Sequence, residues 1–259
     1  MLLCIDIGNT NIHFGLWKDN NWALAWRART VPDKMPDEYA VLLRNFLEAD
    51  GIDLADINGV AIGSVVPTLT LAFTQLVQRY MGFAPLVVTN QTHTGIRVDI
   101  DQPEQAGADR IINSAAVHKL YGGPAIVIDL GTATTFDVVS AQGAYMGGAI
   151  APGINVAHDA LVAHAARLHQ VDIVPPPSAV GRNTIHAMQS GIFWGYVALV
   201  EGLVARIKAA MNETQPVKVI ATGGLAALIE RHTAVIDIIA HELTLDGLRI
   251  IYDLNHPAR

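Results

Sequence analysis

The sequence has only one cysteine, Cys4, among its 259 residues. A single thiol excludes an internal disulfide and a zinc site built from several cysteines. Charged residues are also few, at 16%, and aromatic residues make up 6%, whereas hydrophobic residues make up 51%. Because disordered chains are rich in charge and poor in apolar side chains, this composition predicts a globular protein.

Basic residues are scarce, since 17 Lys and Arg stand against 24 Asp and Glu and give a formal net charge of −7. Nucleic acids and anionic membranes are bound by basic surfaces, so we expect neither as a partner. No run of 18 consecutive apolar residues occurs, and only five residues precede Asp6. We therefore expect no membrane span and no secretory signal, and a cytoplasmic protein is the default prediction.

Segments typical of strands alternate with segments typical of helices along the chain. Short apolar runs predict strands at 2–8, 13–17, 59–66, 85–89, 125–131, 134–140, 144–150 and 217–224. Helical spacing of apolar residues predicts helices at 38–50, 70–80, 108–120 and 185–211, and Leu225 is expected to open another. This alternation is typical of an α/β fold.

A short internal repeat is the most informative feature of the chain. The stretch IDIGNT begins at Ile5, and a similar stretch, IDLGTAT, begins 123 residues later at Ile128. Each copy lies between two apolar strands, so the repeat predicts two related α/β halves, at residues 1–115 and 116–259. Chance is the alternative explanation, because the shared string is short.

The two repeated segments have the composition of phosphate-binding hairpins. Glycine lets the backbone approach a ligand closely, and exposed N–H groups and hydroxyl or amide side chains donate to anionic oxygens. Asp6 and Asp129, at the strand ends, could hold a hydrated cation. The G-x-x-x-x-G-K-[ST] and G-x-G-x-x-G motifs are absent, and neither hairpin contains Lys. A bound polyphosphate would therefore need Mg²⁺ to neutralise it; alternatively, both carboxylates only cap turns.

A glycine pair marks a third element of this kind. Thr222, Gly223 and Gly224 follow an apolar strand and precede a predicted helix. Paired glycines at such a turn would let a flat ring, such as that of adenosine, lie against the backbone near the helix N-terminus. The alternative is a tight turn with no ligand.

Several motifs occur in a fixed order along the chain: Asp6–Thr10, Gly107–Arg110, Asp129–Asp137, Gly147–Gly153 and Thr222–Gly224. This ordered set closely resembles type III pantothenate kinase, a member of the acetate and sugar kinase, heat-shock ATPase and actin superfamily. The resemblance extends from residue 6 to Leu248. It implies ATP-dependent phosphorylation of pantothenate to 4'-phosphopantothenate, the first step of coenzyme A biosynthesis. With the repeated hairpin, it predicts two ribonuclease-H-like (actin-like ATPase) halves with the nucleotide cleft between them.

The resemblance also implies a homodimer, Mg²⁺ with ATP near Asp6, and a monovalent cation, K⁺ or NH₄⁺, at Asp129. The first phosphate loop, and with it the ATP-binding set, would comprise Asp6, Ile7, Gly8, Asn9, Thr10, Asn11, Ile12 and His13, together with Thr132. The segment that matches the pantothenate-binding residues comprises Gly107, Ala108, Asp109 and Arg110, and Asp109 corresponds to the proton acceptor. Thr184, which opens the long helix, matches a pantothenate contact that can come from the partner subunit.

One substrate-binding position departs from the family pattern. Related enzymes commonly carry a Tyr about seven residues before the Gly-Ala-Asp-Arg segment, and in this chain that position is Ile100. A ring contact or a hydroxyl donor is therefore lost. The change affects the expected shape of the pantothenate pocket but not the phosphate-binding residues.

The chemistry of phosphoryl transfer also favours Asp109. The attacking hydroxyl must lose a proton, and an Asp within about 3 Å can accept it. Asp109 follows Gly107 and starts an apolar helix, whose N-terminus is expected to keep the carboxylate ionised. Arg110 beside it can bind a carboxylate or a phosphate with its planar fork. The alternative is a helix-capping pair on the surface.

Two further patterns concern histidines and glycines. The spacing of His158, His164 and His169 does not place them on one helical face, so we expect a solvated helix and no metal cluster. Gly191 and Gly195 lie one turn apart and would allow a close helix crossing, either in the core or at a dimer interface.

Two other functions compete with that of a small-molecule kinase. One is an ATP-driven chaperone or filament protein of the same superfamily, and the other is a non-catalytic regulator. Measuring ATP consumption with and without pantothenate separates all three.

Overall fold

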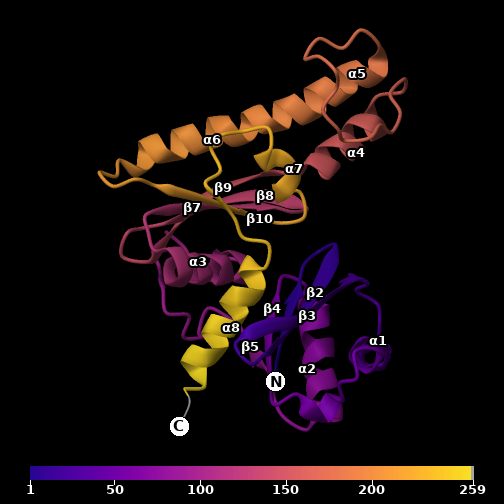
Figure 1. Ribbon diagram of the computed structural model, residues 1–259, viewed down its shortest axis with the longest axis vertical. Coiled ribbons are helices and arrows are strands. Elements are labelled where there is room, and N and C mark those ends of the chain that lie inside the picture. The colour runs from indigo at the N-terminus through magenta and orange to yellow at the C-terminus, as the bar shows by residue number, and fades with distance from the viewer. Residues whose placement is uncertain (258–259) are drawn as a thin grey trace. The chain divides into compact units, whose positions relative to one another are not determined.

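The computed structural model describes residues 1–257, and these form two units (Figure 1). Unit 1 comprises Met1–Tyr121, Gly143–Tyr145 and the described residues from Glu242 onward, and unit 2 comprises Gly122–Gln142 and Met146–His241. The sequence placed the boundary between residues 115 and 116 and assigned the C-terminal segment to the second half. In the structure that segment is a helix that packs within unit 1, because its apolar face matches that unit's core.

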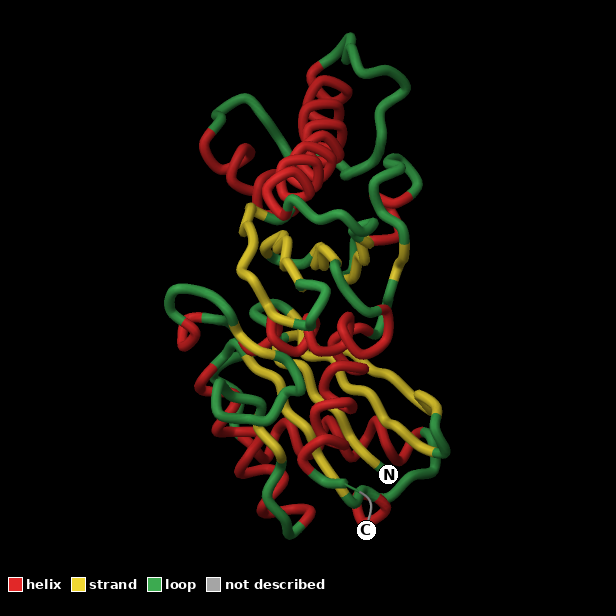
Figure 2. Tube along the Cα trace, turned by 90° about the vertical axis from the view of Figure 1, so that its left-hand side faces the viewer, coloured by secondary structure: helices red, strands yellow, loops and turns green. Residues whose placement is uncertain are grey.

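Unit 1 is built on a five-stranded sheet with the order β3-β2-β1-β4-β5. Figure 2 shows its strands side by side in yellow. The strands are β1 (Leu2–Ile7), β2 (Asn11–Lys18), β3 (Asn21–Arg29), β4 (Gly59–Ser64) and β5 (Leu86–Val87). Strand β1 pairs antiparallel with β2 and parallel with β4. All but β3 were predicted; β3 has regular alternation of exposed and half-buried side chains, the pattern of an edge strand with one solvated face.

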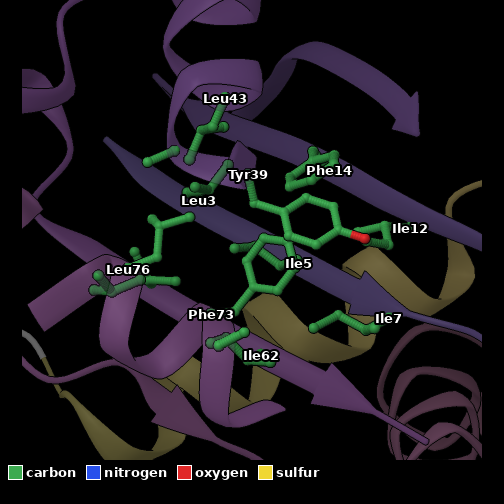
Figure 3. Packing of buried hydrophobic residues seen from close by; sticks show 14 of the residues in the cluster. Leu3, Ile5, Ile7, Ile12, Phe14, Tyr39, Leu43, Ile62, Phe73 and Leu76 are labelled. Atoms are coloured by element: carbon green, nitrogen blue, oxygen red, sulfur yellow. The ribbon is translucent and has the colours of Figure 1, made fainter. Parts of the chain in front are cut away.

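Helices cover both faces of this sheet. They are α1 (Pro36–Ala49), α2 (Pro67–Met81), α3 (Ala108–Tyr121) and α8 (Leu243–Asn255), with short 3₁₀ turns at Leu54–Asp56 and Pro103–Gln105. On one face, Ile5 of β1 packs with α1 and α2 around Tyr39 and Phe73 (Figure 3). On the other, Cys4 packs with Ile112 of α3 and Leu248 of α8. Successive β1 residues thus enter different cores, as the alternation of a strand requires.

Unit 2 contains most of the second sheet, whose strand order is β11-β10-β7-β8-β9-β6. The strands are β6 (Arg97–Val98), β7 (Ala125–Leu130), β8 (Ala133–Val139), β9 (Ala144–Pro152), β10 (Lys218–Thr222) and β11 (Ile238–Ile239). Strand β6 belongs to unit 1 and pairs with Ala144 and Tyr145, the part of β9 that also belongs to unit 1. The rest of β9 continues into unit 2.

The helices of unit 2 include the predicted long one, drawn in orange in Figure 1. They are α4 (Ile154–His164), α5 (Thr184–Gln189), a π-helical turn at Ser190–Trp194, α6 (Gly195–Met211) and α7 (Ala226–Glu230). Together, Thr184–Met211 form 28 helical residues, long and apolar enough by length and composition to cross a membrane. That test is also met by helices of soluble proteins. Val197, Val200 and Val204 instead pack on the sheet of unit 2 with Ile126 and Ile128.

The predicted repeat is present as two equivalent hairpins. In each, the first strand pairs antiparallel with the next one and parallel with a later strand: β1 with β2 and β4, and β7 with β8 and β10. Both halves of this chain therefore have the arrangement expected of the predicted fold class, an α/β protein with two lobes of the actin-like type.

Candidate functional site

The first hairpin ends in an exposed loop whose backbone is fixed by hydrogen bonds. Its turn is closed by the Gly8 N–H, which donates to the Asn11 carbonyl at 3.0 Å. The Thr30 hydroxyl, just after β3, donates to the Gly8 carbonyl at 2.7 Å, and the Thr30 N–H donates to the Thr10 carbonyl at 2.9 Å. The loop is therefore fixed by its neighbours, while its residues Asn9 to Asn11 are exposed.

The predicted ATP-binding residues of this hairpin fall into two groups. Asp6 is half-buried at the end of β1, and Gly8, Asn9, Thr10 and Asn11 line the turn. Ile7 and Ile12 are instead fully buried in the core of unit 1. Their side chains hold the hairpin in place, so only their backbone could face a nucleotide.

His13 lies directly opposite Asp6 across the hairpin. Its Nε2 is 3.3 Å from Oε2 of Glu242, just before α8, and Arg27 is its partner on β3. Burial, followed by the Arg27 guanidinium, lowers the pKa of His13 from 6.5 to about 4. The ring is therefore neutral near pH 7, and its contact with Glu242 is not an ion pair.

The predicted acceptor segment forms the first turn of α3. Asp109 is half-buried, and its Oδ1 accepts a hydrogen bond from the Arg110 N–H at 2.8 Å. A Cβ on residue 107 would lie 2.6 Å from the same Oδ1, so glycine is needed there for the carboxylate to occupy this position. The segment thus places a carboxylate and a guanidinium side by side at a helix start.

Burial is the largest influence on the pKa of Asp109. Burial raises the pKa of Asp109 above its usual value, and the N–H and the charge of Arg110 counteract this rise only in part. The helix N-terminus was expected to favour the ionised carboxylate, and desolvation of the half-buried side chain opposes that influence. A raised pKa makes a carboxylate a better proton acceptor near neutral pH.

Ile100 is half-buried and lies shortly before the 3₁₀ turn that leads to Gly107. The preceding residue, Asp99, donates its N–H to the Tyr145 carbonyl at 2.8 Å, which ties this stretch to the start of β9. The substitution of Ile for the usual Tyr therefore lies on a backbone that is held in place.

The second hairpin is surrounded by glycines. A Cβ on Gly223, whose φ is +92°, would lie 2.7 Å from Asp129 Oδ1, so β10 can approach this carboxylate only with glycine there. A Cβ on Gly153 would lie 2.4 Å from the carbonyl oxygens of both Gly131 and Thr132. The structure thus brings together three predicted motifs, around Asp129, Gly153 and Gly223.

Thr184 and the glycine pair lie along one groove of unit 2. The Thr184 side chain is exposed, and Asn183 caps its helix by accepting the His186 N–H at 2.8 Å. The groove has a volume of about 660 Å³ and an apolar lining that includes Ile154, Leu161, Met188, Ile192 and Leu199. Among residues 1–257, apart from the adjoining residues and backbone of the same helix, no atom lies within 4 Å of a Cβ placed on Gly191 or Gly195. The glycine pair therefore does not serve a helix crossing within this core.

The histidines do not form a metal site. His158 is buried, contrary to the expected solvated helix, and its Nε2 accepts the Val171 N–H at 3.3 Å. Its role is structural, since it holds the loop that follows α4, whereas His164 and His169 are exposed. Within residues 1–257, no group of three His, Cys, Asp or Glu side chains could hold a metal ion.

Comparison of the sequence with protein families yields a match over most of its length. The profile described as type III pantothenate kinase matches residues 2–206. A protein of that name from Roseiflexus sp. (strain RS-1) is 52% identical over 255 residues, which cover 98% of this chain and 99% of the relative. One from Moorella thermoacetica is 48% identical over 98% of this chain and 100% of the relative.

Solved structures resemble the whole chain at low sequence identity. A Baf family protein from Campylobacter jejuni, described as a transcriptional activator, aligns with a TM-score of 0.62 at 20% identity, over 99% of this chain and 100% of its own. A polyphosphate/ATP-glucomannokinase from Arthrobacter aligns with a TM-score of 0.52 at 15% identity, over 98% and 99%. At such identities these likenesses concern the fold alone, and they confirm the predicted two-lobed α/β fold class.

Proposed function

Since the chain belongs to the type III pantothenate kinase family, we propose that Asp109 is the proton acceptor of its reaction and that the two Asp-x-Gly hairpins bind Mg-ATP and a monovalent cation. The family membership carries the activity itself: the chain is a kinase that phosphorylates pantothenate with ATP in coenzyme A biosynthesis. We further propose that it works in the cytoplasm, as a homodimer.

The geometry of the first turn of α3 supports the role of Asp109. The half-buried carboxylate has a raised pKa, which suits a group that takes the proton of a primary hydroxyl as this hydroxyl attacks the γ-phosphate. Arg110 is the residue proposed to bind the substrate carboxylate, because its fork can make two parallel hydrogen bonds. Gly107 leaves room for both, and the backbone of Gly107 and Ala108 completes the proposed pantothenate-binding segment with Ile100.

The first hairpin suits a metal-bound polyphosphate. Mg²⁺ prefers oxygen ligands and retains several waters, and Asp6 offers a half-buried carboxylate beside the exposed side chains of Asn9 and Thr10. The hairpin contains no Lys, so the charge of the polyphosphate must be neutralised by the ion. The turn held by Thr30 keeps the backbone in place for phosphate binding.

The second hairpin suits a monovalent cation. This hairpin offers the carboxylate of Asp129, beside Gly223, and the carbonyl oxygens of Gly131 and Thr132, which both lie against Gly153. Such oxygens are the usual ligands of hard cations. Thr132, exposed at the turn, is the proposed ATP contact of this hairpin.

Replacing Asp109 by Asn tests the proton acceptor. The change keeps the size of the side chain but removes its ability to take a proton, so kcat should fall about 10²–10⁴-fold. The dissociation constant for ATP, measured by calorimetry, should change little. Asp101→Asn is the matched control, since Asp101 is an exposed Asp that lies shortly before Asp109 in the chain. This variant should keep full activity. Near-normal turnover of Asp109→Asn with pantothenate would reject the assignment.

The apolar groove beside Thr184 supports the homodimer. Ile185, which follows Thr184 in the helix, is 57% exposed, and the open notch at Gly191 and Gly195 could receive the same helix of a second copy. Thr184 would then reach the pantothenate bound by the other subunit.

Mixing two defective chains tests this shared site. An Asp109→Asn chain and a Thr184→Val chain should each be impaired as a homodimer. In a mixed dimer one site carries both changes and the other carries neither, so activity should return to roughly half per mixed dimer. Sedimentation would establish the dimer, and co-purification of two chains that carry different affinity tags would establish the exchange. A fully active monomer, or exchange without recovery, would contradict the shared site but not the kinase activity.

A further inference from the structure

Tyr145 lies beneath the proposed substrate-binding Arg110 within unit 1. The Cζ of Arg110 is 5.5 Å from the centroid of the Tyr145 ring. The Tyr145 side chain is 1% exposed, and Arg110 is half-buried. A guanidinium within about 6 Å of an aromatic face is attracted by the ring, and the attraction strengthens when water is excluded. Because Tyr145 is buried, the attraction between its ring and the Arg110 guanidinium is strengthened.

The same residue also fixes the segment that carries Ile100. Tyr145 is paired with Val98 in the parallel ladder between β6 and β9, and its carbonyl accepts the Asp99 N–H at 2.8 Å. The backbone of Tyr145 thus holds the stretch before Ile100, while its ring faces Arg110. One residue connects two parts of the acceptor segment that are separated in sequence.

The ring of Tyr145 limits the freedom of the Arg110 side chain. Arginine is long and flexible, and holding its fork in one plane costs side-chain entropy each time a carboxylate binds. A buried ring beneath the guanidinium restricts the Arg110 side chain before the substrate binds, so less side-chain entropy is lost on binding. The ring also comes from a strand, which is a more rigid support than a loop.

We propose that Tyr145 is a positioning residue for pantothenate, whose ring holds the Arg110 guanidinium in the orientation that receives the substrate carboxylate. The proposal rests on the role of Arg110 given above. It assigns Tyr145 no part in proton transfer or in binding ATP. Its loss should therefore weaken pantothenate binding and leave the other steps unchanged.

Two substitutions at Tyr145 separate the ring from the hydroxyl. Tyr145→Phe keeps the aromatic face, and its KM for pantothenate should stay within about twofold of the wild type. Tyr145→Leu removes the face, and KM for pantothenate should rise about 3- to 30-fold, with kcat and KM for ATP unchanged. Tyr145→Met, which fills the space flexibly, replaces the Leu variant if the latter does not fold. Equal KM values for all variants, or an equal rise in Phe and Leu, would overturn the proposal.

A double-mutant cycle with Arg110 tests whether the Tyr145 ring affects pantothenate binding through the Arg110 side chain. In an Arg110→Ala background, Tyr145→Leu should raise KM for pantothenate no further. An undiminished further rise would mean that the ring acts without Arg110, and the proposal would be wrong. If Arg110→Ala itself leaves KM for pantothenate unchanged, the proposed role of Arg110 fails, which is a different result.

A neutral analogue provides an independent readout. Pantothenol carries a hydroxymethyl group in place of the carboxylate, so it cannot form the paired hydrogen bonds with Arg110. Tyr145→Leu should change KM for pantothenol less than twofold while raising it for pantothenate. An equal rise for both compounds would point to a general defect of the pocket and would contradict the positioning role.

Discussion

The two hairpins share a backbone pattern but differ in what surrounds them. In the first, Asp6 faces His13 across the ladder, and the turn is fastened by Thr30. In the second, Asp129 faces Thr135, Gly153 packs closely against the turn, and Gly223 packs closely against the Asp129 carboxylate. The duplicated hairpin supplies a carboxylate and an open turn in both units, and the difference in their neighbours underlies the proposed assignment of a different ion to each.

Among the changes that distinguish the two hairpins, the loss of the second carboxylate should have the largest effect. Asp129→Ala should lower activity on the order of 10²-fold, because a preorganised charge beside the nucleotide is lost. The remaining activity should no longer distinguish K⁺ from Na⁺. Initial rates in buffers containing only one of these ions measure the effect.

Asp6→Ala provides the contrast within the same experiment. It should also lower activity, but it should retain the preference for K⁺ over Na⁺ and require more Mg²⁺. If Asp6→Ala abolished the K⁺ preference, or if the wild type were fully active in Na⁺ alone, the proposed division between the hairpins would be broken.

Alanine at the glycines tests how tightly each hairpin is enclosed. Gly153→Ala would place its Cβ 2.4 Å from two carbonyl oxygens, so it should destabilise the protein by about 1–3 kcal/mol and reduce activity. Gly8→Ala meets only the Asn11 carbonyl at 3.1 Å and should have a smaller effect. Urea unfolding and initial rates measure both.

Gly202→Ala serves as the control for these changes. It lies in α6, where an added Cβ meets only an Arg206 side-chain nitrogen at 3.5 Å, and alanine favours a helix. Its stability should equal or exceed that of the wild type. A Gly8→Ala effect larger than that of Gly153→Ala would show that the first hairpin is the more constrained.

The last contrast is the pH dependence of stability that arises from the residue opposite the first carboxylate. His13 is held neutral by burial, with a pKa near 4 in the folded protein against 6.5 in the unfolded chain. Between these values the unfolded state binds the extra proton, so stability falls as pH falls from 6.5 towards 4. This residue should account for about 2 kcal/mol of the loss between pH 7 and pH 5.

His13→Gln measures that contribution. Unfolding curves at pH 7 and pH 5 should show a smaller loss of stability for the variant than for the wild type. His169→Gln, a change at an exposed histidine, is the control and should leave the pH dependence as it is in the wild type. Parallel curves for His13→Gln and the wild type would contradict the neutral, buried His13.

Much of the fold could be predicted because its signals are local. The apolar runs of β1, β4, β7 and β10 were found from their composition, and Thr184–Met211 was found from its helical spacing. Strand β3 was missed, because its small and aromatic residues alternate without a strong apolar run. The C-terminal segment was assigned to the wrong half, since only packing against Cys4 and Ile112 reveals where α8 belongs.

The candidate site could be predicted in its residues but not in its energetics. Motif order indicated Asp6, Asp109 and Asp129, the family resemblance indicated Thr184, and their roles remain predictions. The resemblance placed Ile7 and Ile12 in the ATP-binding set, whereas packing makes their side chains part of the core of unit 1. Tyr145 was missed altogether, because its relation to Arg110 depends on a pairing between residues 47 positions apart, Val98 and Tyr145.

The sequence by itself determined the family, the repeated hairpin and the residue types available for phosphoryl transfer, because these depend on the order and chemistry of neighbouring residues. Only the tertiary structure decided how those residues behave. Burial raises the pKa of Asp109 against the pull of its own helix, neutralises His13, and places the Tyr145 ring under Arg110. Desolvation and contact between distant segments set these properties, and neither is written in any short stretch of the chain.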